Sequence, residues 1–105
     1  MLVSSERLYS ELWTSFASLL RAYTAAHGLS KQRIAQVEVS EGAILVRIEQ
    51  RWLRIQHEGA SGQWEREDGR SGTLQMNESG QIRLNDAEFE EMDLVAEELA
   101  RELMR

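Results

Sequence analysis

The residue types that most often catalyse reactions or bind metals are sparse in this chain. Cysteine is absent, which excludes disulfides, thiolate nucleophiles and cysteine-based zinc sites. The two histidines, His27 and His57, lie far apart, and neither belongs to a ligand pattern such as HExxH. No GxSxG motif marks a nucleophilic serine. We therefore expect no metal and no cofactor, and the sequence favours a non-enzymatic protein over an enzyme.

Two other patterns resemble catalytic or phosphate-binding motifs only in part. Glu65, Glu67 and Asp68 lie close together, but acid–base catalysis needs carboxylates in contrasting environments. These three fall on predicted solvent-facing positions with arginines nearby. Residues 68–72 are rich in glycine, but they join two predicted strands rather than a strand and a helix. A hairpin loop is therefore favoured over a phosphate-binding loop.

The charge of the chain is concentrated at its C-terminal end. Residues 86–105 hold eight acidic and two basic side chains, which equals the net charge of −6 of the whole chain. Such an acidic segment favours a basic protein surface as a partner over nucleic acid. The central segment contains six arginines with Trp52 and Trp64 between them, a combination that could bind single-stranded nucleic acid. Eight carboxylates share that segment, however, and cross-strand ion pairs account for the mixture. We expect no nucleic-acid partner.

Exposed aromatic and apolar residues are the better candidates for a binding surface. Tryptophan and arginine are enriched at interface hot spots. Trp64 is the only large apolar residue of residues 63–67, so it either anchors into the core or stands exposed. Leu94 falls on the acidic face of a predicted helix. The interaction candidates are Trp52, Trp64, Arg54, Leu94 and Met92.

Two segments have helical periodicity. In residues 5–27, apolar residues recur every three or four positions and form one stripe, with a milder face of serine, threonine and arginine opposite. Gly28 suits the left-handed stop of that helix. Residues 86–105 form the second amphipathic segment, and Asn85 with Glu88 fits a capping box at its start.

Between these helices the sequence predicts strands. From residue 34 the apolar period changes to two, and Glu41-Gly42 is typical of a tight turn. The alternation changes phase at residues 49–51, which indicates a break. Three further turns, rich in Gly, Asn, Asp and Ser, separate the short strands 63–67, 73–76 and 81–84. Such short loops can join only antiparallel neighbours.

These elements predict an α+β protein. We expect an N-terminal helix, an antiparallel β-meander of about five strands and a C-terminal helix, with both helices packed on one face of the sheet. Residues 1–105 are long enough for a single domain with one core. No apolar run is long enough to span a membrane, and the first residues lack the pattern of a signal peptide. The expected location is the cytoplasm.

The favoured function is a small acidic interaction module, either homodimeric or bound to another protein. Its contacts would use the open face of the sheet or the serine-rich flank of the first helix. The alternative is a small-ligand-binding protein, with a pocket between sheet and helices and an arginine that holds an anionic group. Tyr9, Trp13, Trp52 and Met76 are candidates to line such a pocket.

In size, acidity and an amphipathic C-terminal helix the chain resembles the type III secretion chaperones. The resemblance covers these bulk properties and no motif. It implies a binder of another protein. The chain departs from that family because no helix is predicted in its middle.

Overall fold

The computed structural model describes residues 2–31 and 35–104 of the chain. It confirms the α+β class, with a helix, an antiparallel sheet and a second helix in that order. The sheet has seven strands, where about five were predicted. The elements are α1 (Leu2–Lys31), β1 (Gln36–Ser40), β2 (Ala43–Ile48), β3 (Arg51–Glu58), β4 (Ser61–Arg66), β5 (Ser71–Met76), β6 (Gln81–Leu84), β7 (Glu90–Glu91) and α2 (Met92–Met104).

The sheet is a simple meander in which each strand pairs with the next one along the chain. The predicted break in the alternation is confirmed, because Glu49 and Gln50 form the turn between β2 and β3, with Glu49 at a φ of 55°. No helix interrupts the chain between Gln36 and Glu91. Residue 34, where the strand pattern was expected to begin, lies outside the described residues.

Both predicted helices need corrected boundaries. The first helix begins at Leu2 instead of residue 5, and it continues past Gly28 to Lys31, because one glycine costs a long helix only about 1 kcal/mol. The second helix begins at Met92 instead of residue 86. Asn85 is not its cap: it has a φ of 55°, and its side-chain oxygen accepts a hydrogen bond from the Thr73 backbone N–H at 3.0 Å. The segment before Met92 contains the unpredicted strand β7, which pairs with β6.

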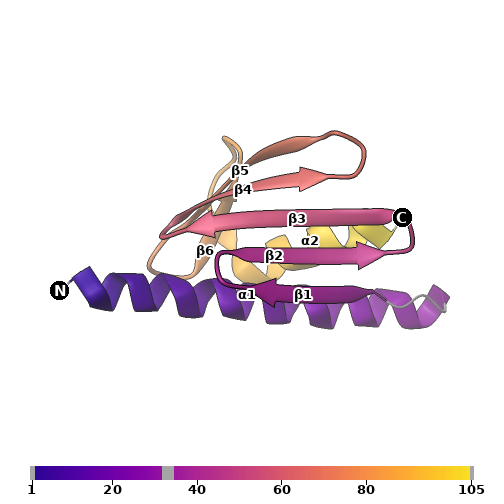
Figure 1. The fold of residues 1–105 in the computed structure, drawn as a ribbon, viewed down its shortest axis with the longest axis horizontal. Helices are drawn as coiled ribbons and strands as arrows, with labels where there is room; N and C mark the ends of the chain where they lie inside the picture. Colours follow the sequence, from indigo (N-terminus) through magenta and orange to yellow (C-terminus); the bar gives the residue numbers. More distant parts are fainter. Residues whose placement is uncertain (1, 32–34, 105) are drawn as a thin grey trace.

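The core lies between one face of the sheet and the two helices, as predicted. Alternate strand residues face the helices, and they form one cluster with the apolar stripes of α1 and α2. Figure 1 shows α1 running alongside β1 and extending past the end of the sheet, while α2 lies behind the middle strands. A helix of 30 residues is about 45 Å long, which matches the longest dimension of the molecule, 46 Å. Neither α1 nor α2, the two helices of the described residues, covers the opposite, outer face of the sheet.

Trp13 ties α1 to the far end of the central hairpin. Its ring nitrogen donates to the carbonyl of Gly59, in the β3–β4 turn, at 2.7 Å. Its ring stacks on His57, with centroids 4.6 Å apart and planes inclined by 12°. The side chain itself is buried. One residue thus fixes the helix, the end of β3 and a turn relative to one another.

Candidate functional site

The predicted interaction residues do not form one surface. Trp52 and Arg54 meet on the outer face of the sheet, where the guanidinium carbon lies 5.5 Å from the indole centroid. Arg54 also donates to Glu65 on the neighbouring strand. Trp64 lies on the opposite, helix-facing side, because it pairs with Ile55 and Gly72 in the sheet. The sequence allows Trp64 to lie either in the core or on the surface. In the structure Trp64 packs against the core.

Leu94 and Met92 are at the start of α2 but face different ways. Leu94 is 56% exposed. Met92 packs against the core cluster instead. Exposed acids surround Leu94 on this side of the helix. A basic partner for this acidic face stays a prediction.

The free edge of the sheet is a more definite feature. β1 pairs with β2 on one side only, and it is the first strand in the sheet order. Val39 of β1 pairs with Ile44, which places it on the core side of the sheet. Nevertheless Val39 is 47% exposed, because the sheet is uncovered beyond this edge. The alternation of the sequence placed Val39 correctly in a strand but could not show that the strand is at an edge.

One flank of α1 lies beside this edge. Ser10 and Thr14 line a hollow of about 330 Å³ together with Val39, and the Arg21 guanidinium donates to the carbonyl of Val37 at 3.3 Å. At helical spacing Ser18 and Ala25 fall on the same side. We call Ser10, Thr14, Ser18, Arg21 and Ala25 the α1 flank; all five are exposed. It shares Ser10, Ser18 and Arg21 with the milder face identified from the sequence, whereas Thr24 of that face is buried.

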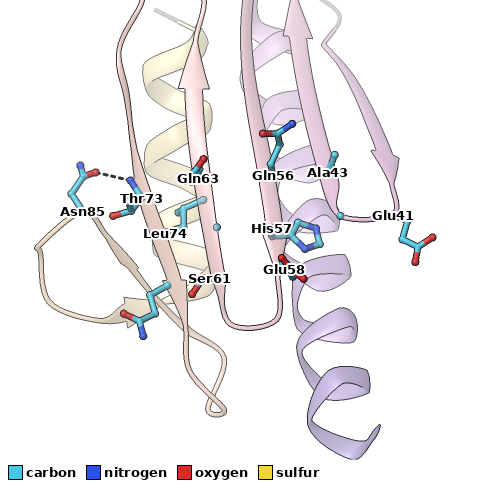
Figure 2. Close-up of a pocket in the computed structure, with 13 residues that line it drawn as sticks. Glu41, Ala43, Gln56, His57, Glu58, Ser61, Gln63, Thr73, Leu74 and Asn85 are labelled. Atoms are coloured by element: carbon cyan, nitrogen blue, oxygen red, sulfur yellow. Dashed lines mark hydrogen bonds between the residues drawn. The ribbon is translucent and has the colours of Figure 1, made fainter. Parts of the chain in front are cut away.

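A shallow polar groove crosses the outer face of the sheet. It has a volume of about 710 Å³, and Figure 2 shows Gln56, Gln63 and Thr73 side by side on neighbouring strands. His57, at one end, has a lowered pKa because its partial burial disfavours the charged ring. The groove is broad and open, and within it no buried polar side-chain atom of the described residues lacks a partner. Its size alone therefore does not mark a ligand site.

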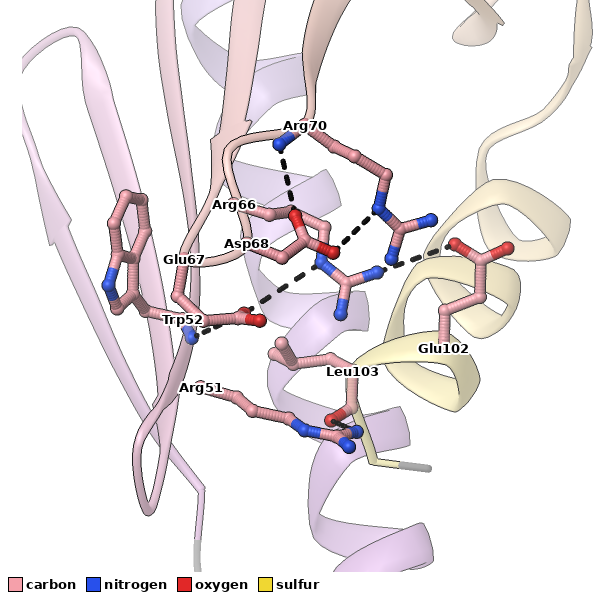
Figure 3. Close-up of polar contacts among 8 residues, drawn as sticks. All are labelled: Arg51, Trp52, Arg66, Glu67, Asp68, Arg70, Glu102 and Leu103. Carbon is pink, nitrogen blue, oxygen red and sulfur yellow. Dashed lines mark hydrogen bonds and ion pairs between the residues drawn. The ribbon is translucent and has the colours of Figure 1, made fainter.

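A cluster of arginines and carboxylates lies where β4 and the β4–β5 turn approach the end of α2. Figure 3 shows Arg66 between Glu67 and Glu102, and Arg70 against Asp68. The Arg70 guanidinium donates to Asp68 at 2.7 Å. The pKa of Asp68 is lowered, first by the hydrogen bond from the Arg70 backbone N–H and further by the Arg70 guanidinium. The charges of Asp68 and Arg70 therefore neutralise each other.

Arg66 is one of the six arginines of the central segment for which cross-strand ion pairs were expected. It lies instead on the core side of β4, and it is only 7% exposed. The sequence did contain a signal, since Arg66 is two residues after Trp64 and the period of a strand puts both on one face. That signal could be used only once Trp64 was known to face the core.

Comparison with known proteins gives this chain no relative. No family model, no curated protein and no solved structure matches it. Among the described residues, no group of three or more histidine and acidic side chains is placed to hold a metal ion. None of the helices, over the same residues, is long and apolar enough to cross a membrane. The function must be argued from the surfaces themselves.

Proposed function

We propose that the protein is a non-enzymatic interaction module that forms a homodimer through β1 and the α1 flank. The observation that carries the proposal is the exposure of Val39, at 47%. A single exposed apolar residue is ordinary on a protein surface. Val39, however, lies on an edge strand whose outer side pairs with no other strand of the sheet, where the strand of a second copy would cover it.

The edge of β1 is open to strand addition except where Arg21 of α1 donates to the Val37 carbonyl. Monomeric proteins commonly protect such an edge with proline, lysine, a bulge or a very short strand. β1 has neither proline nor lysine, and its five residues pair with β2 in unbroken register. Glu38 is its only charged residue, and it accepts from Arg47 at 3.3 Å on the outer face. A second strand would gain backbone hydrogen bonds and would desolvate no unpaired charge on β1.

The α1 flank fits the same second copy. A two-fold axis beside β1 would place the two β1 strands antiparallel and bring the two α1 helices near each other. Ser10, Thr14, Ser18 and Ala25 are small, so two helices could approach closely there. Arg21 is the exception, because its side chain is long. Its hydrogen bond to the Val37 carbonyl is exposed, so breaking that bond on dimerisation would cost little free energy. Strand edge and helix flank would thus form one self-complementary interface.

The proposal is tested by placing a charge at the edge. Val39→Lys puts an ammonium group where the second strand would pack, so we expect the dimer to weaken at least about tenfold, or ~1.4 kcal/mol. Leu45→Lys is the matched control, because Leu45 lies on the neighbouring strand but on the outer face. Sedimentation velocity over a concentration series measures the association of each variant. Circular dichroism checks that each is folded.

Two results would oppose the proposal. If Val39→Lys dimerises like the unmodified protein, β1 is not in the interface. If Leu45→Lys dissociates the dimer and Val39→Lys does not, the copies meet through the outer face of the sheet, beside Trp52 and Arg54.

A further inference from the structure

Arg66 is a charged side chain enclosed in the structure without adequate partners. It is more than nine-tenths buried, on the side of β4 that faces α2. Burying a guanidinium removes its hydration, and only close, hydrogen-bonded partners offset that loss. The nearest carboxylate oxygens belong to Glu67 and Glu102, at 4.0 and 3.9 Å. Both distances exceed hydrogen-bond length.

The unsatisfied atom can be named. Nε of Arg66 is buried and has no hydrogen-bond acceptor among the described residues. Glu67 does not supply one, because its Oε1 lies 4.0 Å from Nε, and that oxygen accepts from the Trp52 backbone N–H at 3.2 Å. A buried N–H without an acceptor loses its hydration and gains nothing in return, and the loss is larger when the group is charged. The position therefore calls for an acceptor that this part of the chain does not provide.

A cavity lies at this position, and one of the residues that line it, Trp64, carries a second unsatisfied donor. The cavity measures about 170 Å³ and is lined by Trp64, Arg66, Leu84 and Leu99, among others. Nε1 of Trp64 is also buried without an acceptor. Trp64 and Arg66 are two residues apart on β4, so their Cα atoms are about 7 Å apart on one face. A wider cleft of about 420 Å³, on the side seen in Figure 3, shares Arg66 and Glu102 with the cavity.

We propose that this cavity binds a small organic monocarboxylate. The carboxylate would accept hydrogen bonds from Nε of Arg66 and Nε1 of Trp64, and a short apolar chain would lie against Leu84 and Leu99. Arginine recognises a carboxylate better than other side chains do, because its planar donors match the two oxygens. The volume lies below the range of drug-sized pockets, which restricts the ligand to a few heavy atoms.

The carboxylates around the cavity select against more highly charged anions. Glu98 and Glu102 line it, and Glu67 lies 4.0 Å from Arg66. Arg70 adds little positive charge, because Asp68 neutralises it at 2.7 Å. Repulsion grows with the charge of the ligand, so a phosphate dianion is disfavoured where a monoanion is accepted. The site is separate from the proposed dimer interface, because β1 is the first strand of the sheet and β4, which carries Trp64 and Arg66, is the fourth.

The test is a titration of the ¹⁵N-labelled full-length protein with propionate, at constant ionic strength. Inorganic phosphate is titrated in parallel. We expect propionate to shift the Trp64 indole N–H and Arg66 Nε–H resonances saturably in the millimolar range, as suits a ligand of so few atoms. Phosphate is expected to leave both resonances unmoved. No saturable propionate shift, or a saturable shift with phosphate alone, would overturn the proposal.

Variants separate a binding site from a merely structural arginine. Arg66→Met keeps a long apolar stem and should abolish the propionate shift of the Trp64 signal. Trp64→Phe removes one donor, and the Arg66 signal then reports weaker binding. Glu102→Gln removes a competing carboxylate and should tighten propionate binding about fivefold, the effect of one unit charge about 4 Å away in water.

The matched control is Glu97→Gln, since Glu97 is on the same helix but pairs with Arg101 at 2.8 Å. It should leave propionate affinity unchanged. Equal effects of Glu97→Gln and Glu102→Gln would show a general charge effect and overturn the assigned site. Should Arg66→Met fail to fold, the sign of the Glu102→Gln effect still decides.

Discussion

At the residue scale, the pair of Trp13 and His57 shows how one contact sets a pH response. His57 stacks on Trp13, and its burial lowers the pKa of the ring from 6.5. The unfolded chain therefore takes up the proton at a higher pH than the folded protein does. Stability is expected to be unaffected by His57 above about pH 6.5 and to fall as the pH drops below it.

His57→Gln removes that titrating ring. We expect its urea midpoint to fall less between neutral and mildly acidic pH than that of the unmodified protein. Both proteins keep their other titrating groups, so the difference between their two slopes isolates His57. Identical slopes would show that His57 has the same pKa in the folded and unfolded chains.

Gly72 is a second residue whose identity is dictated by its neighbours. A Cβ atom there would lie 2.0 Å from Oδ1 of Asn85 and 2.6 Å from Nε1 of Trp64. Gly72→Ala must therefore displace the Asn85 side chain from its hydrogen bond to Thr73, and we expect a loss of about 1–3 kcal/mol. Thermal or urea unfolding measures it. Thr73→Ala, one residue along on the exposed face, should cost clearly less, and equal losses would refute this packing.

At the scale of elements, the pattern of apolar residues predicted what each segment is better than where it ends. Period-two alternation located the strands, and the phase change at residues 49–51 located a turn. The predicted start of α2 was wrong. Asn85 is a residue type that often caps a helix, but here its side-chain oxygen accepts a hydrogen bond from the Thr73 backbone N–H on β5. Such a long-range hydrogen bond leaves no mark in the nearby sequence.

The contact between α1 and β1 gives a prediction at this scale. Arg21 donates to the carbonyl of Val37 at 3.3 Å, so it partly covers the edge to which a second strand would add. Arg21→Ala uncovers that edge and adds to the α1 flank another small residue. We expect this variant to dimerise more tightly in sedimentation velocity experiments. Weaker association than in the unmodified protein would mean that Arg21 is itself an interface contact.

At the scale of the whole molecule, burial and position in the sheet determine which residues are candidates for binding. The sequence identified Trp52, Arg54 and Leu94 by type, and they stay candidates on separate surfaces. It did not single out Val39 or Arg66, which are candidates because of where they lie. Val39 is an exposed apolar residue at the edge of the sheet, and Arg66 is a buried charged residue. Neither position can be known before the order of the strands and the covered face are known.

The whole molecule presents an edge and a helix flank on one side, and the central claim is that a second copy covers both. Native mass spectrometry of the purified protein tests this most directly. We expect a dimer of two 12.1 kDa chains, and a larger share of monomer for Val39→Lys at the same concentration. A monomer throughout a concentration series reaching well above the micromolar range would contradict it.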